Sequence, residues 1–148
     1  MRILFQFEAT ENPEPETIFE LFRRSFGPEQ EEDEQVLGCD RGTFKKVMPF
    51  IRDLYFGVMA HKAELDRLLS EASEHWRLDR MSRVDRNVMR LALYEMIHRE
   101  DIPAKVSINE AIELGKEFGA DESGAFINGI LDRIHRQRLQ EDQEGRDE

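Results

Sequence analysis

Histidines and glutamates at helical spacing are the residues of this chain that most suggest metal chemistry. Glu95 and His98 have the Glu-x-x-His spacing that helical di-iron sites use, and His61 and Glu64 have the same spacing in reverse order. A di-iron site needs two such pairs and two further inward-facing glutamates, and the sequence does not complete that set. The sequence therefore predicts no metal site. Glu95 is interpreted as a structural carboxylate paired with an arginine or with backbone donors, because a buried charge needs a partner.

Other catalytic patterns are also incomplete. The single cysteine, Cys39, lies in a polar stretch with no histidine close to it in sequence. The chain contains neither a G-x-S-x-G element nor a glycine-rich phosphate loop. The sequence therefore predicts a protein that is not an enzyme and uses no cofactor. A single cysteine cannot form an internal disulfide, which favours a reducing, cytoplasmic location.

A row of arginines is the clearest candidate for a charged binding surface. Arg83, Arg86 and Arg90 recur at helical spacing on the side opposite an apolar stripe. One interpretation is a solvated face with local ion pairs to Asp79 and Asp85. The other is a strip that contacts phosphate or a protein partner, because the guanidinium group suits phosphate oxygens. The sequence alone leaves both open.

The net charge of −11 is unevenly distributed. Residues 1–40 hold 3 basic and 11 acidic side chains, and residues 140–148 hold 1 and 5. The intervening residues hold 17 basic and 16 acidic side chains and are nearly neutral. Because whole-chain charge speaks to solubility and association rather than to one site, the acidic total does not exclude RNA binding.

Three helical patterns follow one another between residues 82 and 134, and the first begins near Ser82. Ser107 and Glu110 have capping-box spacing and are expected to open the second helix. Gly119 is expected to close that helix in a left-handed conformation. These three helices are predicted to form a compact core.

The remaining patterns are also helical, and the sequence shows no strand alternation. No apolar run approaches the roughly 20 residues of a membrane span. The prediction is an all-α fold of about seven helices in a single domain over residues 1–139, followed by an acidic, disordered tail at 140–148. The further helical patterns cover residues 1–9, 17–26, 42–60 and 65–72.

Three strings of this core are similar to one known family. R-L-A-L-Y-E, I-P-A-K-V-S-I-N-E-A-I-E-L-G-K-E-F-G and F-I-N-G-I-L-D-R-I resemble the transcription antitermination factor NusB family. This similarity covers about a third of the chain, and a weaker one that includes L-F-Q-F-E near the start extends it to most of the rest. The resemblance implies a NusB-like bundle of two packed helical subdomains.

The resemblance also implies a function. Family members bind boxA-like RNA of ribosomal RNA operons together with the NusE-type small-subunit ribosomal protein, and they act in the transcription elongation complex in antitermination and termination. No membrane is involved, and a homodimer is left open. The positions matching the partner-binding surface are Phe5 and Asp85. The positions matching the RNA-binding surface are Arg2, Glu122, Ser123, Phe126 and Asn128.

The chain departs from the family pattern at its start. Family members carry several basic residues before the helix that contains L-F-Q-F-E, whereas this chain begins inside that helix and has only Arg2 there. Fewer phosphate contacts weaken RNA binding and flatten its salt dependence. The alternative function is therefore a protein-interaction module that keeps the partner surface but has lost useful RNA binding.

Overall fold

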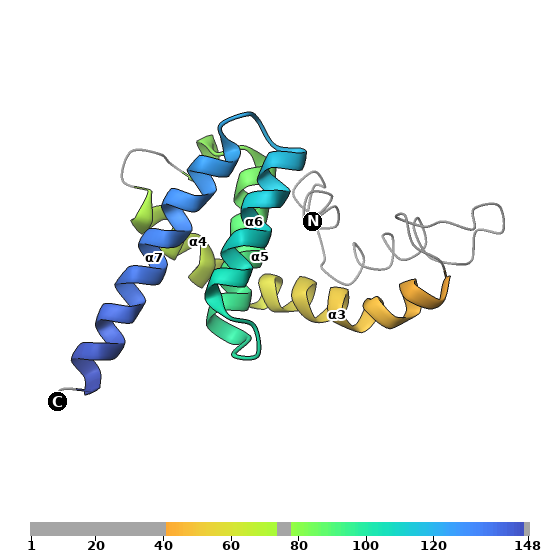
Figure 1. The fold of residues 1–148 in the computed structure, drawn as a ribbon, viewed down its shortest axis with the longest axis horizontal. Helices are drawn as coiled ribbons and strands as arrows, with labels where there is room; N and C mark the ends of the chain where they lie inside the picture. Colours follow the sequence, from red (N-terminus) through yellow and green to blue (C-terminus); the bar gives the residue numbers. More distant parts are fainter. Residues whose placement is uncertain (1–40, 74–77, 147–148) are drawn as a thin grey trace. The chain divides into compact units, whose positions relative to one another are not determined.

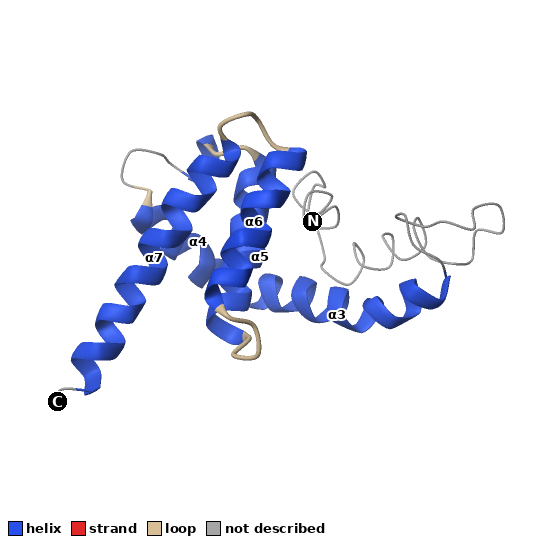
Figure 2. Cartoon of the chain, viewed as in Figure 1, coloured by secondary structure: helices blue, strands red, loops and turns tan. Residues whose placement is uncertain are grey.

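The computed structural model describes residues 41–73 and 78–146, and all regular structure in these residues is helical (Figure 2). The all-α prediction is confirmed, and the helices expected at 1–9 and 17–26 lie outside the described residues. Among the described helices, none combines the length and apolar character needed to cross a membrane. The elements are α3 (Arg41–Ala60), α4 (Lys62–Ala72), the 3-10 helix η1 (Leu78–Arg80), α5 (Arg83–His98), α6 (Ala104–Phe118) and α7 (Ser123–Arg146) (Figure 1).

The chain divides into two compact units, Met1–Ala60 and His61–Glu148. Helix α3 is the described part of the first unit, and it continues through Pro49, which cannot donate a backbone hydrogen bond. Tyr55 and Val58 are buried on its apolar side, as the helical spacing predicts. Burial raises the pKa of Tyr55 to about 12, so this side chain remains neutral at physiological pH.

Helices α5, α6 and α7 of the second unit pack side by side, with α6 against both of the others (Figure 1). Their buried residues recur at the spacing of one helix face, which is the pattern that the sequence shows. Gly115 of α6 lies at the closest approach to α7: an added Cβ would lie 2.5 Å from Ile127 Cδ1. The fully buried side chains of this core include Val88, Leu93, Ala111, Ile127, Leu131 and Ile134.

Helix α6 begins and ends differently from the prediction. It begins at Ala104, with Pro103 at the N-cap and no side-chain capping bond, so the capping box from Ser107 to Glu110 is wrong. A proline suits this position because the first helical turn has unused N–H groups. Gly119 is extended, with φ −98° and ψ −167°, rather than left-handed. A side chain at Gly119 would instead collide with the Ser123 hydroxyl, so space rather than conformation requires glycine here.

The structure also differs from the prediction of a disordered tail at 140–148, because α7 continues to Arg146. The last fully buried residue of α7 is Ile134, and residues 139–146 are all exposed. Local interactions extend the helix past the core: Glu, Gln, Arg and Leu are good helix formers. Arg136 pairs with Asp132 one turn earlier at 3.0 Å.

Candidate binding site

A pocket of about 170 Å³ lies where the start of α5 meets the turn between α6 and α7. The family resemblance implies separate surfaces for the RNA-binding and the partner-binding positions. In the structure, three RNA-binding positions (Glu122, Ser123 and Phe126) and one partner-binding position (Asp85) line a single pocket. It is lined by Arg80, Met81, Ser82, Asp85, Ala120, Glu122, Ser123 and Phe126.

Asp85 is placed in the pocket by the cap of α5. The Ser82 hydroxyl accepts a hydrogen bond from the Asp85 backbone N–H at 3.0 Å and caps the helix that the sequence predicts to begin near Ser82. The Asp85 side chain is 9% exposed, and its Oδ1 atom has no hydrogen-bond partner among the described residues. A buried acceptor without a donor costs about 1–3 kcal/mol. Asp85 therefore contributes to the pocket wall a buried acceptor that no described residue satisfies.

The first turn of α7 forms the other wall of the pocket. The Ser123 hydroxyl, which is almost fully buried, accepts a hydrogen bond from the Ala120 N–H at 2.9 Å. The Ser123 N–H donates to the Ala120 carbonyl at 3.0 Å, so two hydrogen bonds between Ser123 and Ala120 stabilise this turn. Ser123 thus holds the shape of the site, while Glu122 is exposed at its edge.

Phe126 and Asn128 differ in position. The sequence does not decide between a core role and base stacking for Phe126, and the structure makes it half-buried and part of the pocket wall. The neighbouring Ile127 takes the core position instead. Asn128 is exposed on α7 and does not line the pocket. The two remaining candidates, Arg2 and Phe5, lie outside the described residues.

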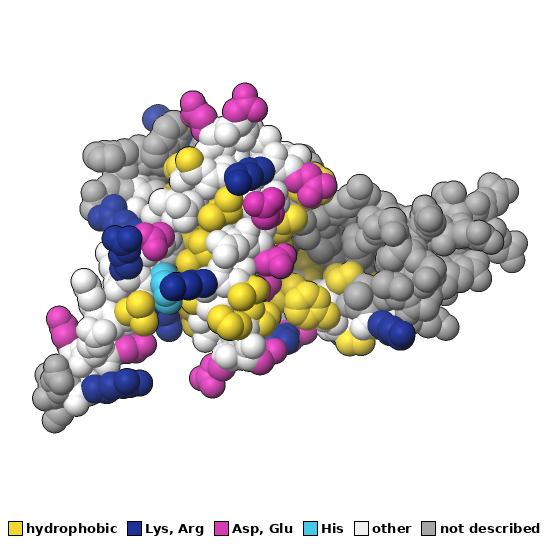
Figure 3. Space-filling view, viewed as in Figure 1, with side chains coloured by type: hydrophobic (Ala, Val, Ile, Leu, Met, Phe, Trp, Pro, Cys, Tyr) yellow, Lys and Arg dark blue, Asp and Glu magenta, His cyan; other side chains and the backbone are white. Residues whose placement is uncertain are grey.

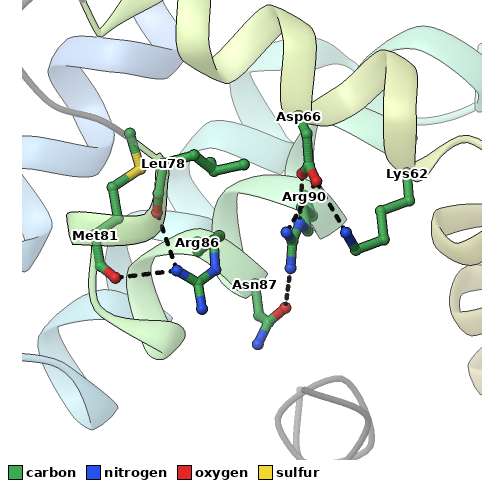
Figure 4. Close-up of polar contacts among 7 residues, drawn as sticks. All are labelled: Lys62, Asp66, Leu78, Met81, Arg86, Asn87 and Arg90. Atoms are coloured by element: carbon green, nitrogen blue, oxygen red, sulfur yellow. Dashed lines mark hydrogen bonds and ion pairs between the residues drawn. The ribbon is translucent and has the colours of Figure 1, made fainter. Parts of the chain in front are cut away.

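Two of the three arginines in the predicted strip serve the fold. Arg90 is 3% exposed, and its guanidinium donates to both carboxylate oxygens of Asp66 on α4, at 2.7 and 3.0 Å, and to Asn87 Oδ1 at 3.0 Å (Figure 4). Arg86 donates to the backbone carbonyls of Leu78 and Met81 at 3.0 and 3.3 Å (Figure 4). For Arg90, both the phosphate-contact interpretation and the solvated-face interpretation are therefore wrong. Arg86 is half-buried, and its contact with phosphate or a partner stays a prediction.

Glu95 is structural, with a partner other than those predicted. The Ser107 hydroxyl, 1% exposed, donates to Glu95 Oε2 at 2.9 Å and joins α5 to α6. Burial raises the pKa of the Glu95 carboxyl, and the bond from Ser107 opposes that rise. His98 does not combine with Glu95. It lies beside His61 and Glu64 at the start of α4, a grouping that helical spacing does not reveal because His61 and His98 are 37 positions apart.

The surface offers mixed charge. On the face shown in Figure 3, basic and acidic side chains of the described residues are interspersed. The pocket lining is also of mixed charge, with the basic side chain of Arg80 and the acidic side chains of Asp85 and Glu122. A nonspecific attraction for polyanions is thus weak here, and recognition would depend on contacts inside the pocket.

The helices of the described residues define an all-α protein. The NusB family model matches residues 1–136 of this chain. The chain belongs to the NusB family, which supports the prediction that it is not an enzyme.

Named relatives agree with this assignment. A transcription antitermination protein NusB from Myxococcus xanthus (strain DK1622) is 60% identical over 85 residues, which are 57% of this chain and 61% of that protein. The chain thus spans about three fifths of that relative's length. A protein of the same name from Desulfatibacillum aliphaticivorans is 43% identical over 91% of this chain and 83% of its own length. The solved structure of T. maritima NusB is 38% identical, with a TM-score of 0.74, over 91% of this chain and 84% of that one.

Proposed function

We propose that this protein acts in transcription antitermination, by binding boxA-like RNA of ribosomal RNA operons together with a NusE-type small-subunit ribosomal protein. The observation that carries the proposal is the pocket in which Asp85, Glu122, Ser123 and Phe126 meet. Membership of the NusB family and the name shared by the relatives support the same function.

Each wall of the pocket has a separate part in the proposed recognition. The first turn of α7 offers helix N-terminal N–H groups and a positive dipole end, which suit a phosphate. Phe126 offers a ring on which one base stacks, an interaction worth about 1–3 kcal/mol per base. Asp85 offers an unpaired acceptor for a donor of the ribosomal protein. The RNA and the partner would then meet along one edge of the second unit.

The test is a fluorescence anisotropy titration of a labelled boxA-like RNA at several salt concentrations. The chain alone is expected to bind weakly, with a shallow salt slope, since each phosphate contact on a single strand adds only about 0.7 to that slope. Adding the ribosomal protein is expected to tighten binding by raising the effective concentration of a second RNA surface. Phe126→Ala should weaken the ternary complex by about 5- to 150-fold, the equivalent of one lost base stack.

Phe118→Ala is the matched control, because Phe118 is 51% exposed at the end of α6 and does not line the pocket. It should leave RNA affinity unchanged. If Phe126→Ala, Phe118→Ala and the parent all bound the RNA with equal affinity, the pocket would not be the RNA-binding site. The alternative function, an interaction module that has lost useful RNA binding, would be favoured by a different result. In that result the chain binds the ribosomal protein, but no RNA binding is detected either for the chain alone or for its complex with that protein.

A further inference from the structure

We propose that His61, Glu64 and His98 form a binding site for one divalent transition-metal ion, with Zn²⁺ as the representative case. The three residues each offer one ligand atom, and these atoms lie within 4.8 Å of one another. Two imidazole nitrogens and one carboxylate oxygen are ligands that zinc prefers. The site lies outside the pocket described above and does not depend on the proposed function.

Three elements of the fold bring these side chains together. His61 and Glu64 lie three residues apart at the start of α4, so they share one face of that helix. His98 is the last residue of α5, and α5 packs against α4. The ion pair from Arg90 to Asp66 fixes that packing from its buried side.

The distances fit coordination better than they fit hydrogen bonding. His61 Nδ1 and His98 Nε2 each lie 3.5 Å from the same atom, Glu64 Oε2. That separation is longer than the 2.7–3.2 Å typical of N–H···O bonds. Two ligand atoms bound at about 2.0–2.1 Å to a tetrahedral zinc ion are about 3.4 Å apart. Glu64 Oε2 is therefore already at the spacing of a shared ligand from each nitrogen, and all three ligand atoms lie within 4.8 Å of one another.

The two histidine rings also lie against each other before any ion binds. Their centroids are 3.9 Å apart with an interplanar angle of 23°, and Tyr94 lies behind them with its ring centre 5.4 Å from that of His98. Tyr94 is only 7% exposed and so forms a rigid backing. His61 stands at the N-cap of α4 but makes no capping hydrogen bond with its side chain. Rotation about the soft second torsion of each histidine would turn both lone pairs toward one ion.

Coordination would clamp the start of α4 to the end of α5. The three ligand side chains are partly exposed, at 40%, 38% and 27%, so an ion has access from solvent. Three protein ligands leave one tetrahedral position for water. Because the ion would bind only the folded arrangement, it is expected to stabilise the second unit against unfolding.

The experiment uses the full chain without an affinity tag. Isothermal titration calorimetry with Zn²⁺ should show one ion per chain, and Zn²⁺ should raise the melting temperature where Mg²⁺ does not. Co²⁺ should give the visible absorption of a tetrahedral nitrogen and oxygen site, and Zn²⁺ should displace it. His61→Gln, Glu64→Gln and His98→Gln should each weaken Zn²⁺ binding about tenfold or more.

His135→Gln is the matched control, because His135 lies on α7 and is not part of the group. It should keep the parent affinity. Melting curves without metal establish that each variant folds, which is expected because the three side chains are partly exposed. The proposal is overturned if the parent shows no one-to-one binding, or if folded ligand variants bind Zn²⁺ as tightly as the parent.

Discussion

The contact between α4 and α5 and the pocket at the start of α5 use charged residues in opposite ways. At the contact, the buried guanidinium of Arg90 has donors matched to acceptors on Asp66 and Asn87. In the pocket, the buried Asp85 Oδ1 atom has no hydrogen-bond partner among the described residues. Both groups lie on the same helix and both are removed from water, so burial does not distinguish them.

Hydrogen-bond satisfaction distinguishes them. A buried charge whose donors or acceptors are matched inside the chain specifies how helices pack. A buried charged group with an unmatched acceptor destabilises the free protein, and a ligand that supplies the missing donor removes this cost when it binds. Mutations should therefore separate the two regions: the α4–α5 contact should control stability, and the pocket should control association.

The largest effect is expected from Arg90→Ala. Removing one member of a buried ion pair costs about 3–5 kcal/mol of unfolding free energy. The loss should fall near 3 kcal/mol, because Asp66 is 18% exposed and keeps Lys62 at 3.1 Å. Urea denaturation measures it. Arg90→Lys should restore little, since one ammonium group cannot reproduce the two-pronged contact.

Arg83→Ala provides the comparison within the same predicted strip. Arg83 is exposed at the first turn of α5, and its truncation should change the unfolding free energy by less than about 0.5 kcal/mol. RNA affinity at fixed salt should not change in any Arg90 variant that remains folded. If Arg90→Ala were stable and bound RNA more weakly, the arginine strip would regain a binding role.

An intermediate effect is expected from Glu95→Ala. This change leaves the buried Ser107 hydroxyl without its acceptor, which costs about 1–3 kcal/mol. The loss is smaller than for Arg90 because the partner is neutral and Glu95 is only half-buried. Thermal melts at pH 7 measure it. Glu95→Gln should largely retain stability, since an amide oxygen can accept the same hydrogen bond.

The pH dependence gives an independent check on Glu95. Because burial raises the pKa of this carboxyl in the folded state, folding favours its protonated form. Its contribution to stability is therefore greatest below the unfolded-state pKa and is lost as pH rises through the folded-state pKa. The stability of the parent relative to Glu95→Gln should rise as the solution is acidified from pH 7 toward 4.5. A relative stability that does not change over this range would contradict the assigned burial.

Local patterns predicted most of the helices in the described residues. The apolar spacing placed α3 closely and placed the start of α5 near Ser82, where the structure has its N-cap. Errors arose where one local signal competed with another. Ser107 has the spacing of a cap, but its hydroxyl is used by Glu95 on the neighbouring helix, and Pro103 begins α6 instead.

The candidate site was less predictable, because its geometry depends on contacts between distant residues. Arg90 and Asp66 are 24 residues apart, and nothing in the periodicity of α5 indicates that pairing. The pocket joins Asp85 to Phe126 only because α6 packs against both α5 and α7. The resemblance supplied the identities of these residues, whereas their meeting in one pocket required the structure.

The smallest effect on stability is expected from Asp85→Asn, together with a clear loss of association. The variant loses a helix-dipole interaction worth about 0.3–1 kcal/mol, and it also no longer buries an unpaired charge. These terms oppose each other, so the unfolding free energy should change by less than about 1 kcal/mol. Asparagine keeps an acceptor oxygen but loses the charge, and a hydrogen bond to a charged group contributes about 1.5–3 kcal/mol against about 0.5–1.5 kcal/mol for a neutral pair. Affinity for the NusE-type protein should therefore fall by about fivefold or more in calorimetry. Asp132→Asn, at an exposed ion pair of α7, is the control and should leave that affinity unchanged. A destabilised Asp85→Asn protein with normal partner affinity would assign Asp85 to the fold, and the contrast between the pocket and the α4–α5 contact would fail.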